Sequence, residues 1–129
     1  MSTLNEQQAA EQLLSGYAEV LNAANTALIP SFYTHDGAFM PDGFKTLTKK
    51  DLDNAGGKYL KNTGFKIKYA IISVTITPEY TFIDATAQTT AVSVGKKEEA
   101  NLSSRDFFVL RKEGSDWKIF RYLFNRTQN

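Results

Sequence analysis

The segment Ser103–Arg126 most constrains the fold, because it contains two long apolar runs joined by one short turn. The turn is Glu113-Gly114-Ser115-Asp116, and both runs are rich in aromatic and β-branched residues, which favour β-strands. In a sheet with one face in water, apolar and polar residues alternate along each strand. Here both alternating sets of positions are largely apolar. We therefore predict a β-hairpin that is covered on both faces.

The length and composition limit the classes of function. A chain of 129 residues without linker, repeat or low-complexity segment predicts a single domain over residues 1–129. The formal net charge of +1 offers no general attraction for nucleic acid or acidic membranes. The absence of cysteine excludes thiolate chemistry, and a single histidine argues against a histidine-based metal site or a Ser-His-Asp triad. We expect neither a metal nor another cofactor.

No targeting segment is expected. The first residues, MSTLNEQQAAEQ, lack the cationic start and apolar stretch of a signal peptide. No run approaches the ~18 apolar residues that span a bilayer. These features predict a cytoplasmic protein that uses neither a membrane nor nucleic acid as a partner.

The N-terminal half has helical patterns. Thr3 and Glu6 have the spacing of a capping box, and apolar residues then recur every three or four positions. We expect a first helix over residues 4–24 and a short second helix after Asn25, closed by a turn at residues 35–37. A short strand over 37–41, a turn at 42–43 and a helix from about 48 to 60 should follow, with Gly64 as its terminator.

From Phe65 onward the apolar period changes to two, which is typical of strands. The phase shifts at Ile71-Ile72 and predicts a β-bulge. After a turn at Pro78-Glu79, the strand 82–94 has a polar side and a side made mainly of alanine. The polar side carries Asp84, Thr86 and Gln88. It can face the interior of the fold or the solvent, and we favour the interior because the small apolar side suits an interface.

The order of the elements predicts an α+β fold, in which N-terminal helices lie on one face of a curved antiparallel sheet. Alternate side chains of a strand point to opposite faces, so one apolar set must lie outside. Such a patch exceeds what monomers usually expose. We therefore expect a homodimer in which the outer sheet faces pack together about a two-fold axis. The sets concerned are Ile83, Ala85, Ala87, Thr89 and Ala91 on one strand and Phe107, Val109, Ile119 and Leu123 in the hairpin.

Three stretches resemble the nuclear transport factor two-like superfamily, which contains SnoaL-like polyketide cyclases and ketosteroid isomerases. They are YAEVLNA at 17–23, FYTHDGAF at 32–39, and the hairpin pattern RDFFVL, WKI and YLFN between 105 and 125. The resemblance covers nearly the whole chain. It implies a cystatin-like cone, in which a strongly curved sheet wraps the helices and leaves a pocket at the open end. Dimerisation through the outer sheet face is common in this group.

The resemblance also implies candidate catalytic residues. In ketosteroid isomerase-like members, a tyrosine on the first helix and a carboxylic acid on a late strand stabilise a developing oxyanion. Tyr17 and Asp106 match these two positions. The base position is matched by Pro41, which cannot carry a proton, so the candidate bases are Asp42 beside it and His35.

We interpret the chain as a domain that binds a small, partly apolar organic molecule. Two other functions stay open: an acid–base enzyme, such as an isomerase, cyclase or dehydratase acting on a carbonyl compound, and a non-catalytic interaction or assembly module with a filled cone. A core tyrosine bonded to the backbone is the alternative for Tyr17, and a structural ion pair is the alternative for Asp106. The expected ligand-binding residues are Tyr17, Phe39, Tyr59, Asp84, Asp106, Phe108, Tyr122 and Phe124.

Overall fold

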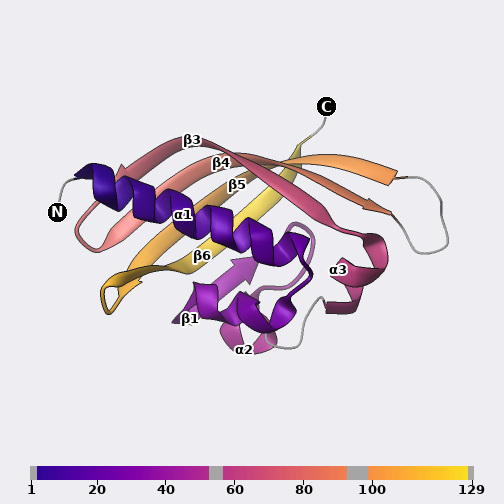
Figure 1. Cartoon of the computed structure of the whole chain (residues 1–129), viewed down its shortest axis with the longest axis horizontal. Helices are drawn as coiled ribbons and strands as arrows, with labels where there is room; N and C mark the ends of the chain where they lie inside the picture. The colour runs from indigo at the N-terminus through magenta and orange to yellow at the C-terminus, as the bar shows by residue number, and fades with distance from the viewer. Residues whose placement is uncertain (1–2, 53–56, 93–98, 128–129) are drawn as a thin grey trace.

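A long helix lies across the concave face of a six-stranded sheet in the computed structural model, which describes residues 3–52, 57–92 and 99–127 (Figure 1). The elements in chain order are α1 (Thr3–Asn22), the 3-10 helix η1 (Thr26–Phe32), β1 (Tyr33–Met40), β2 (Leu47–Thr48), α2 (Lys49–Leu52), α3 (Gly57–Thr63), β3 (Lys66–Ile76), β4 (Tyr80–Val92), β5 (Glu99–Glu113) and β6 (Asp116–Thr127). The predicted α+β class and the curved sheet around N-terminal helices are confirmed.

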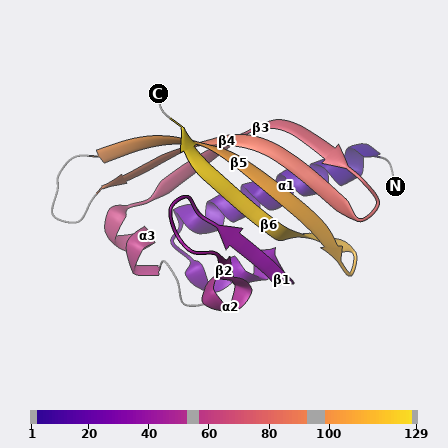
Figure 2. The same ribbon diagram turned by 180° about the vertical axis from the view of Figure 1, so that it is seen from behind.

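The strand order is β2-β1-β6-β5-β4-β3, and β3 to β6 form an antiparallel meander. The predicted sheet was antiparallel throughout, but β1 runs parallel to β6, so the sheet is mixed. No tight turn joins these two strands, which lie far apart in the sequence, so nothing forces them to be antiparallel. The convex face of the sheet, opposite α1, is turned to the viewer in Figure 2.

The β5–β6 hairpin turns at Gly114-Ser115, as predicted, and Gly114 has a φ of 68°. One residue of β6 has no partner in β5, because the register passes from Leu110 opposite Ile119 to Val109 opposite Arg121. Phe120 is that extra residue. The bulge reverses the phase, so Ile119 lies inside, contrary to the expectation that it belongs to the outer face.

The bulge predicted in β3 is confirmed. The register with β4 shifts between Ile71 and Ser73, and the unpaired Ile72 is 69% exposed. Residues on both sides of the bulge, Tyr69 and Val74, therefore still pack against the core.

The predicted orientation of β4 is wrong. Ile83, Ala85 and Ala87 are buried beneath the helix, whereas Asp84, Thr86 and Gln88 are exposed on the convex face. The concave face has little room, because aromatic side chains from the neighbouring strands occupy it; Ala87, for example, pairs with Tyr69. Small side chains therefore suit the inside of this strand. The Asp84 carboxylate accepts a hydrogen bond from Ser73 Oγ at 2.9 Å on the outer face.

Helix α1 is fixed to the sheet at both ends. Glu6 was expected to cap its own helix, but its carboxylate accepts hydrogen bonds from Lys112 Nζ (3.1 Å) and Trp117 Nε1 (2.9 Å) on the hairpin. At the other end, the Asn22 amide bonds both backbone groups of Ile67 on β3, at 3.1 and 2.7 Å. The side chain of Thr3, the expected cap, lies outside the described residues.

The turn predicted at His35-Asp36-Gly37 lies inside β1, so that prediction is wrong. The register between β1 and β6 shifts between Tyr33 and Ala38, which shows that the strand is irregular there. A Cβ atom on Gly37 would lie 2.7 Å from the Ile119 carbonyl oxygen, so only glycine allows β1 to approach β6 this closely. The turn-forming residues thus make a bulge instead of a chain reversal.

The helix predicted over 48–60 is described as two helices, α2 and α3, and residues 53–56 between them lie outside the described residues. Thr48 and Asp51 cap the start of α2 reciprocally: the Thr48 N–H donates to Asp51 Oδ2 at 3.0 Å, and the Asp51 N–H donates to Thr48 Oγ1 at 3.4 Å. Gly64, with a φ of 60°, follows α3 as predicted. The composition of Gly95-Lys96-Lys97-Glu98-Glu99 predicts a charged, solvated hairpin tip, and most of this segment lies outside the described residues.

Candidate functional site

A cavity of about 630 Å³ lies between the C-terminal half of α1, the concave face of the sheet and the helices α2 and α3. Asp42, Phe44, Lys45 and Arg126 line it near the end of β6, and their exposure to solvent marks its mouth there. The walls are mainly apolar, and the residues that form them include Leu21, Ile29, Phe39, Leu47, Leu52, Leu60, Phe65 and Phe124.

Polar groups gather at one end of this cavity. Tyr122 Oη donates to Asp106 Oδ2 at 2.6 Å, and Ser104 Oγ donates to Asp106 Oδ1 at 2.6 Å. Tyr69 Oη lies 2.9 Å from Tyr122 Oη. Four side chains from three strands thus form one hydrogen-bonded chain, Tyr69–Tyr122–Asp106–Ser104.

The carboxyl group of Asp106 is buried, with 3% of the residue exposed. Burial raises its pKa, and the hydrogen bonds from Ser104 and Tyr122 oppose that shift only in part. Among the described residues no cation pairs with it, so the structural ion pair considered for Asp106 is absent. A carboxyl group in this setting holds a proton more readily than one in water and can then act as a donor.

Tyr17 reaches the cavity from α1, and its hydroxyl lies 2.7 Å from that of Tyr33 rather than against the backbone. Tyr33 is fully buried and does not line the cavity. A buried donor without an acceptor costs about 1–3 kcal/mol. Either hydroxyl can donate in this pair; when Tyr33 donates, its proton is satisfied and the Tyr17 proton is free to serve the cavity. Burial raises the pKa of both tyrosines, so both stay protonated.

The mouth of the cavity carries charged and apolar side chains. Asp42, Lys45 and Arg126 line it together with Phe44, which is 79% exposed. Asp42 Oδ2 accepts a hydrogen bond from the Arg126 backbone N–H at 2.9 Å. Asp42 therefore ties the loop after β1 to the end of β6, where Arg126 pairs with Ser104 of β5.

Most of the residues predicted from the sequence meet at this cavity. Phe108 does not line it: the side chain is fully buried and stacks on Tyr122, with centroids 4.0 Å apart. Asp84 is on the opposite face of the sheet. The side chain of Tyr59 lies outside the described residues. The predicted residues that line the cavity are Tyr17, Phe39, Asp42, Asp106, Tyr122 and Phe124.

His35, the other candidate base, lies away from the cavity. Its side chain is 78% exposed, and Nδ1 lies 3.0 Å from Glu113 Oε2. His35 is therefore an exposed residue that takes no part in the cavity.

Tyr69 and Ser104 are parts of the site that the sequence reasoning missed. Ser104 stands two residues before Asp106, and Tyr69 two residues after the buried Ile67, so each shares the inward phase of its strand. The inward-facing position of both residues on their strands was the signal in the sequence that could have identified them.

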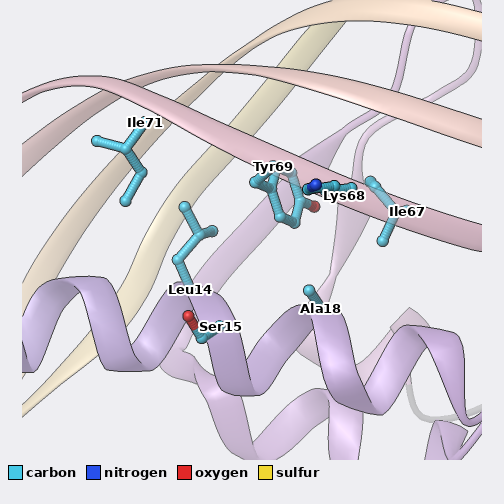
Figure 3. A pocket seen from close by; sticks show the side chains of 7 residues that line it. All are labelled: Leu14, Ser15, Ala18, Ile67, Lys68, Tyr69 and Ile71. Carbon is cyan, nitrogen blue, oxygen red and sulfur yellow. The ribbon is translucent and has the colours of Figure 1, made fainter.

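A second cavity, of about 230 Å³, lies between α1 and β3 (Figure 3). In Figure 3 Leu14, Ser15 and Ala18 come from the helix, and Tyr69 comes from β3 above them. Tyr69 and Ile67 line both cavities. The Tyr69 ring therefore forms part of the wall between them.

The described part of the chain contains no cluster of His, Cys, Asp or Glu side chains that could hold a metal ion. Nor does it contain a helix with the length and apolarity needed to cross a bilayer. The cytoplasmic location stays a prediction.

Comparisons with known proteins identify the fold. No family model matches the chain, and no curated protein matches it. Solved structures do match, and all those described here are less than 25% identical.

A ketosteroid isomerase-like protein from Erwinia carotovora atroseptica has a TM-score of 0.79 at 20% identity and covers 95% of this chain and 96% of its own. A nuclear transport factor two-like protein with a cystatin-like fold from Novosphingobium aromaticivorans has a TM-score of 0.80 at 14% identity, with coverages of 94% and 81%. A type 2 hexachlorocyclohexane dehydrochlorinase has a TM-score of 0.86 at 9% identity, with coverages of 97% and 87%. These likenesses confirm the expected fold and leave the activity open.

Proposed function

We propose that this chain, which has the cystatin-like cone fold of the nuclear transport factor two-like superfamily, binds a small, partly apolar organic molecule in the larger cavity. The observation that carries the proposal is an open apolar cavity whose hydrogen-bonding groups gather around Asp106 at one end. Ligand sites in proteins usually combine apolar walls with a few polar groups and have volumes of about 300–1,000 Å³. The cavity fits that description.

A pair of variants on one strand tests this proposal. Ala91 lines the cavity, and Thr86 is exposed on the opposite face of β4. The assay is thermal-shift screening of a library of small aromatic and alicyclic compounds. Ligands that stabilise the wild type should not stabilise Ala91→Trp, because the indole fills the cavity, and should still stabilise Thr86→Trp. A library without a single stabilising compound, or hits that survive Ala91→Trp unchanged, would refute the proposal.

A second candidate is acid–base catalysis on a carbonyl compound. Tyr17 and Asp106 line the same cavity, and burial raises the pKa of Asp106, which supports a role as a proton donor to a developing oxyanion. Asp42 is the candidate base that lines the cavity. It stands at the mouth and accepts a hydrogen bond from Arg126.

Deuterium exchange at the carbon next to the carbonyl of 1-tetralone, followed by NMR, tests the enzymatic candidate. An oxyanion donor contributes about 10²–10³-fold to a rate, so Asp106→Asn should slow the protein-catalysed exchange by that factor. Asp42→Asn should remove it if Asp42 is the base. Exchange no faster than in buffer would refute catalysis with this substrate class and leave ligand binding untouched.

The third alternative, an interaction module, predicts a cone filled by side chains, and the open cavity argues against it.

We also propose that the chain forms a homodimer, now because of the apolar side chains on the convex face of the sheet. The convex sheet face carries a half-exposed cluster of Tyr80, Phe82, Phe107 and Phe120, with ring centroids 6.1–6.3 Å apart from one neighbour to the next. Leu123, 39% exposed, extends the apolar face. A second copy of the chain would cover it.

A further inference from the structure

The number of protons in the hydrogen-bonded chain Tyr69–Tyr122–Asp106–Ser104 determines the direction of each of its hydrogen bonds. The chain has three hydrogen bonds, and its three hydroxyl groups bring one proton each. When Asp106 is ionised, Ser104 and Tyr122 both donate to the carboxylate, and Tyr69 donates to Tyr122. Every hydroxyl proton is then used, and the Tyr69 oxygen offers the cavity only a lone pair.

When Asp106 takes up a proton, the chain holds four protons for the same three hydrogen bonds. On Oδ1 the new proton would reverse the bond to Ser104 and leave the Ser104 proton over. On Oδ2, the oxygen that Tyr122 contacts, Asp106 donates to Tyr122 and Tyr122 donates to Tyr69. In that arrangement the Tyr69 proton is left over, and among the described residues the Tyr69 hydroxyl has no partner besides Tyr122. Since Tyr69 lines the cavity, this proton requires an acceptor there.

We propose that the cavity receives a neutral ligand through a carbonyl oxygen that accepts a hydrogen bond from the Tyr69 hydroxyl, and that binding is coupled to uptake of one proton by Asp106. The inference rests on the proposed ligand binding and adds the ligand class and its linkage to pH. The proton comes from water. No bond of the ligand breaks, and only the direction of the hydrogen bonds changes.

Within this hydrogen-bonded chain, Asp106 is the group that changes charge. The neighbouring strands present Ala85 of β4 and Phe124 of β6 opposite it, and neither titrates. The other titratable groups around the polar end, among the described residues, are tyrosines, and burial raises the pKa of each, away from neutral pH. They are Tyr17 from α1, Tyr33 from β1, Tyr69 from β3 and Tyr122 from β6. Asp42, Lys45 and Arg126 also line the cavity, and the Asp106→Asn variant described below separates their effects on binding from that of Asp106.

The test compares 1-tetralone with tetralin, which has the same hydrocarbon frame without the carbonyl oxygen. Isothermal titration calorimetry of the full chain in two buffers of different ionisation enthalpy measures proton uptake. We expect uptake of up to one proton with 1-tetralone and none with tetralin. Above the pKa of Asp106, the affinity for 1-tetralone should fall by up to about tenfold per pH unit, and that for tetralin should stay constant.

Three variants test which side chains are required for the proton uptake. Tyr69→Phe removes the terminal hydroxyl, so the affinity for 1-tetralone should fall toward that for tetralin and the proton uptake should disappear. Asp106→Asn should also abolish the uptake and make binding of 1-tetralone independent of pH. Tyr80→Phe removes a hydroxyl on the convex face and should leave both ligands unaffected.

Two outcomes overturn the inference alone: 1-tetralone binds to the wild type without proton uptake, or the uptake persists in Tyr69→Phe or Asp106→Asn. In both cases ligand binding itself stands. If neither compound binds, while both remain soluble at the concentrations used, the proposed function fails for this class of molecule and the inference fails with it.

Discussion

Replacement of Asp106 by asparagine tests the electrostatics of the cavity without any ligand. Asparagine has nearly the shape of the protonated acid: its oxygen can accept from Ser104, and its amide can donate to Tyr122. The two hydrogen bonds of 2.6 Å can therefore both be kept. What the variant loses is the charge.

The sign of the effect follows from the raised pKa of Asp106. A carboxyl group whose pKa is raised on folding stabilises the fold fully below its unfolded pKa, here 3.8, and that stabilisation is lost as the pH rises through the folded pKa. The wild type should therefore lose stability relative to Asp106→Asn as the pH rises above ~4. The relative loss is about 1.4 kcal/mol for each unit by which folding raises the pKa.

Urea unfolding of both proteins between pH 4 and pH 8 measures this difference. Effects of other titrating groups cancel in the comparison because both proteins share them. Asp36→Asn is a contrasting variant, since the Arg111 guanidinium lowers the pKa of Asp36 to about 2. Asp36 should stabilise the wild type by a constant amount between pH 4 and pH 8, and measurements extended to pH 2 should show that effect being lost as the pH falls below about 4. A difference between wild type and Asp106→Asn that is constant with pH, or that grows toward acid, would refute the argument.

Three further substitutions have definite expected outcomes. Gly37→Ala should lower the free energy of unfolding by about 1–3 kcal/mol, because the new methyl group would lie 2.7 Å from the Ile119 carbonyl oxygen; chemical denaturation with an unchanged midpoint would contradict this. Thr81→Val should raise stability by about 1 kcal/mol, because Thr81 Oγ1 is buried without a partner in the described part of the chain; a lower midpoint in urea would show that the hydroxyl is satisfied. Val109→Lys, on the convex face, should convert the proposed dimer into a monomer of similar stability in equilibrium sedimentation at micromolar concentration, and a wild type that is already monomeric would disprove the dimer.

Local patterns in the sequence correctly predicted those features of the fold that depend only on residues close together in the chain. The apolar spacing that includes Leu14 and Tyr17 gave the buried stripe of α1, and the phase shift at Ile71-Ile72 gave the β3 bulge, because each signal lies within one element. Gly114 marked the hairpin turn for the same reason. The cavity residues Tyr17 and Asp106 came from the resemblance to a known family.

Contacts between distant segments were beyond such patterns. Nothing near Glu6 indicates that it bonds Trp117 of the hairpin, and nothing near Tyr17 identifies Tyr33 as its partner. The inward face of β4 was misassigned because the space left by aromatic side chains on adjacent strands decided it. The bulge at Phe120 was missed because both phases of that strand are apolar, so a change of phase leaves no trace in the composition.

The two bulges also determine where the chain can change its length. Phe120 and Ile72 have no partner in the neighbouring strand, and the pairing on either side continues as if each were absent. Deleting Phe120 would therefore leave Tyr122 and Phe124 directed at the cavity, while the outer surface would lose the ring over which the guanidinium groups of Arg111 and Arg121 lie. Insertions and deletions at these two positions can thus remodel the outside of the cone and its bend, and the lining of the cavity is inherited unchanged.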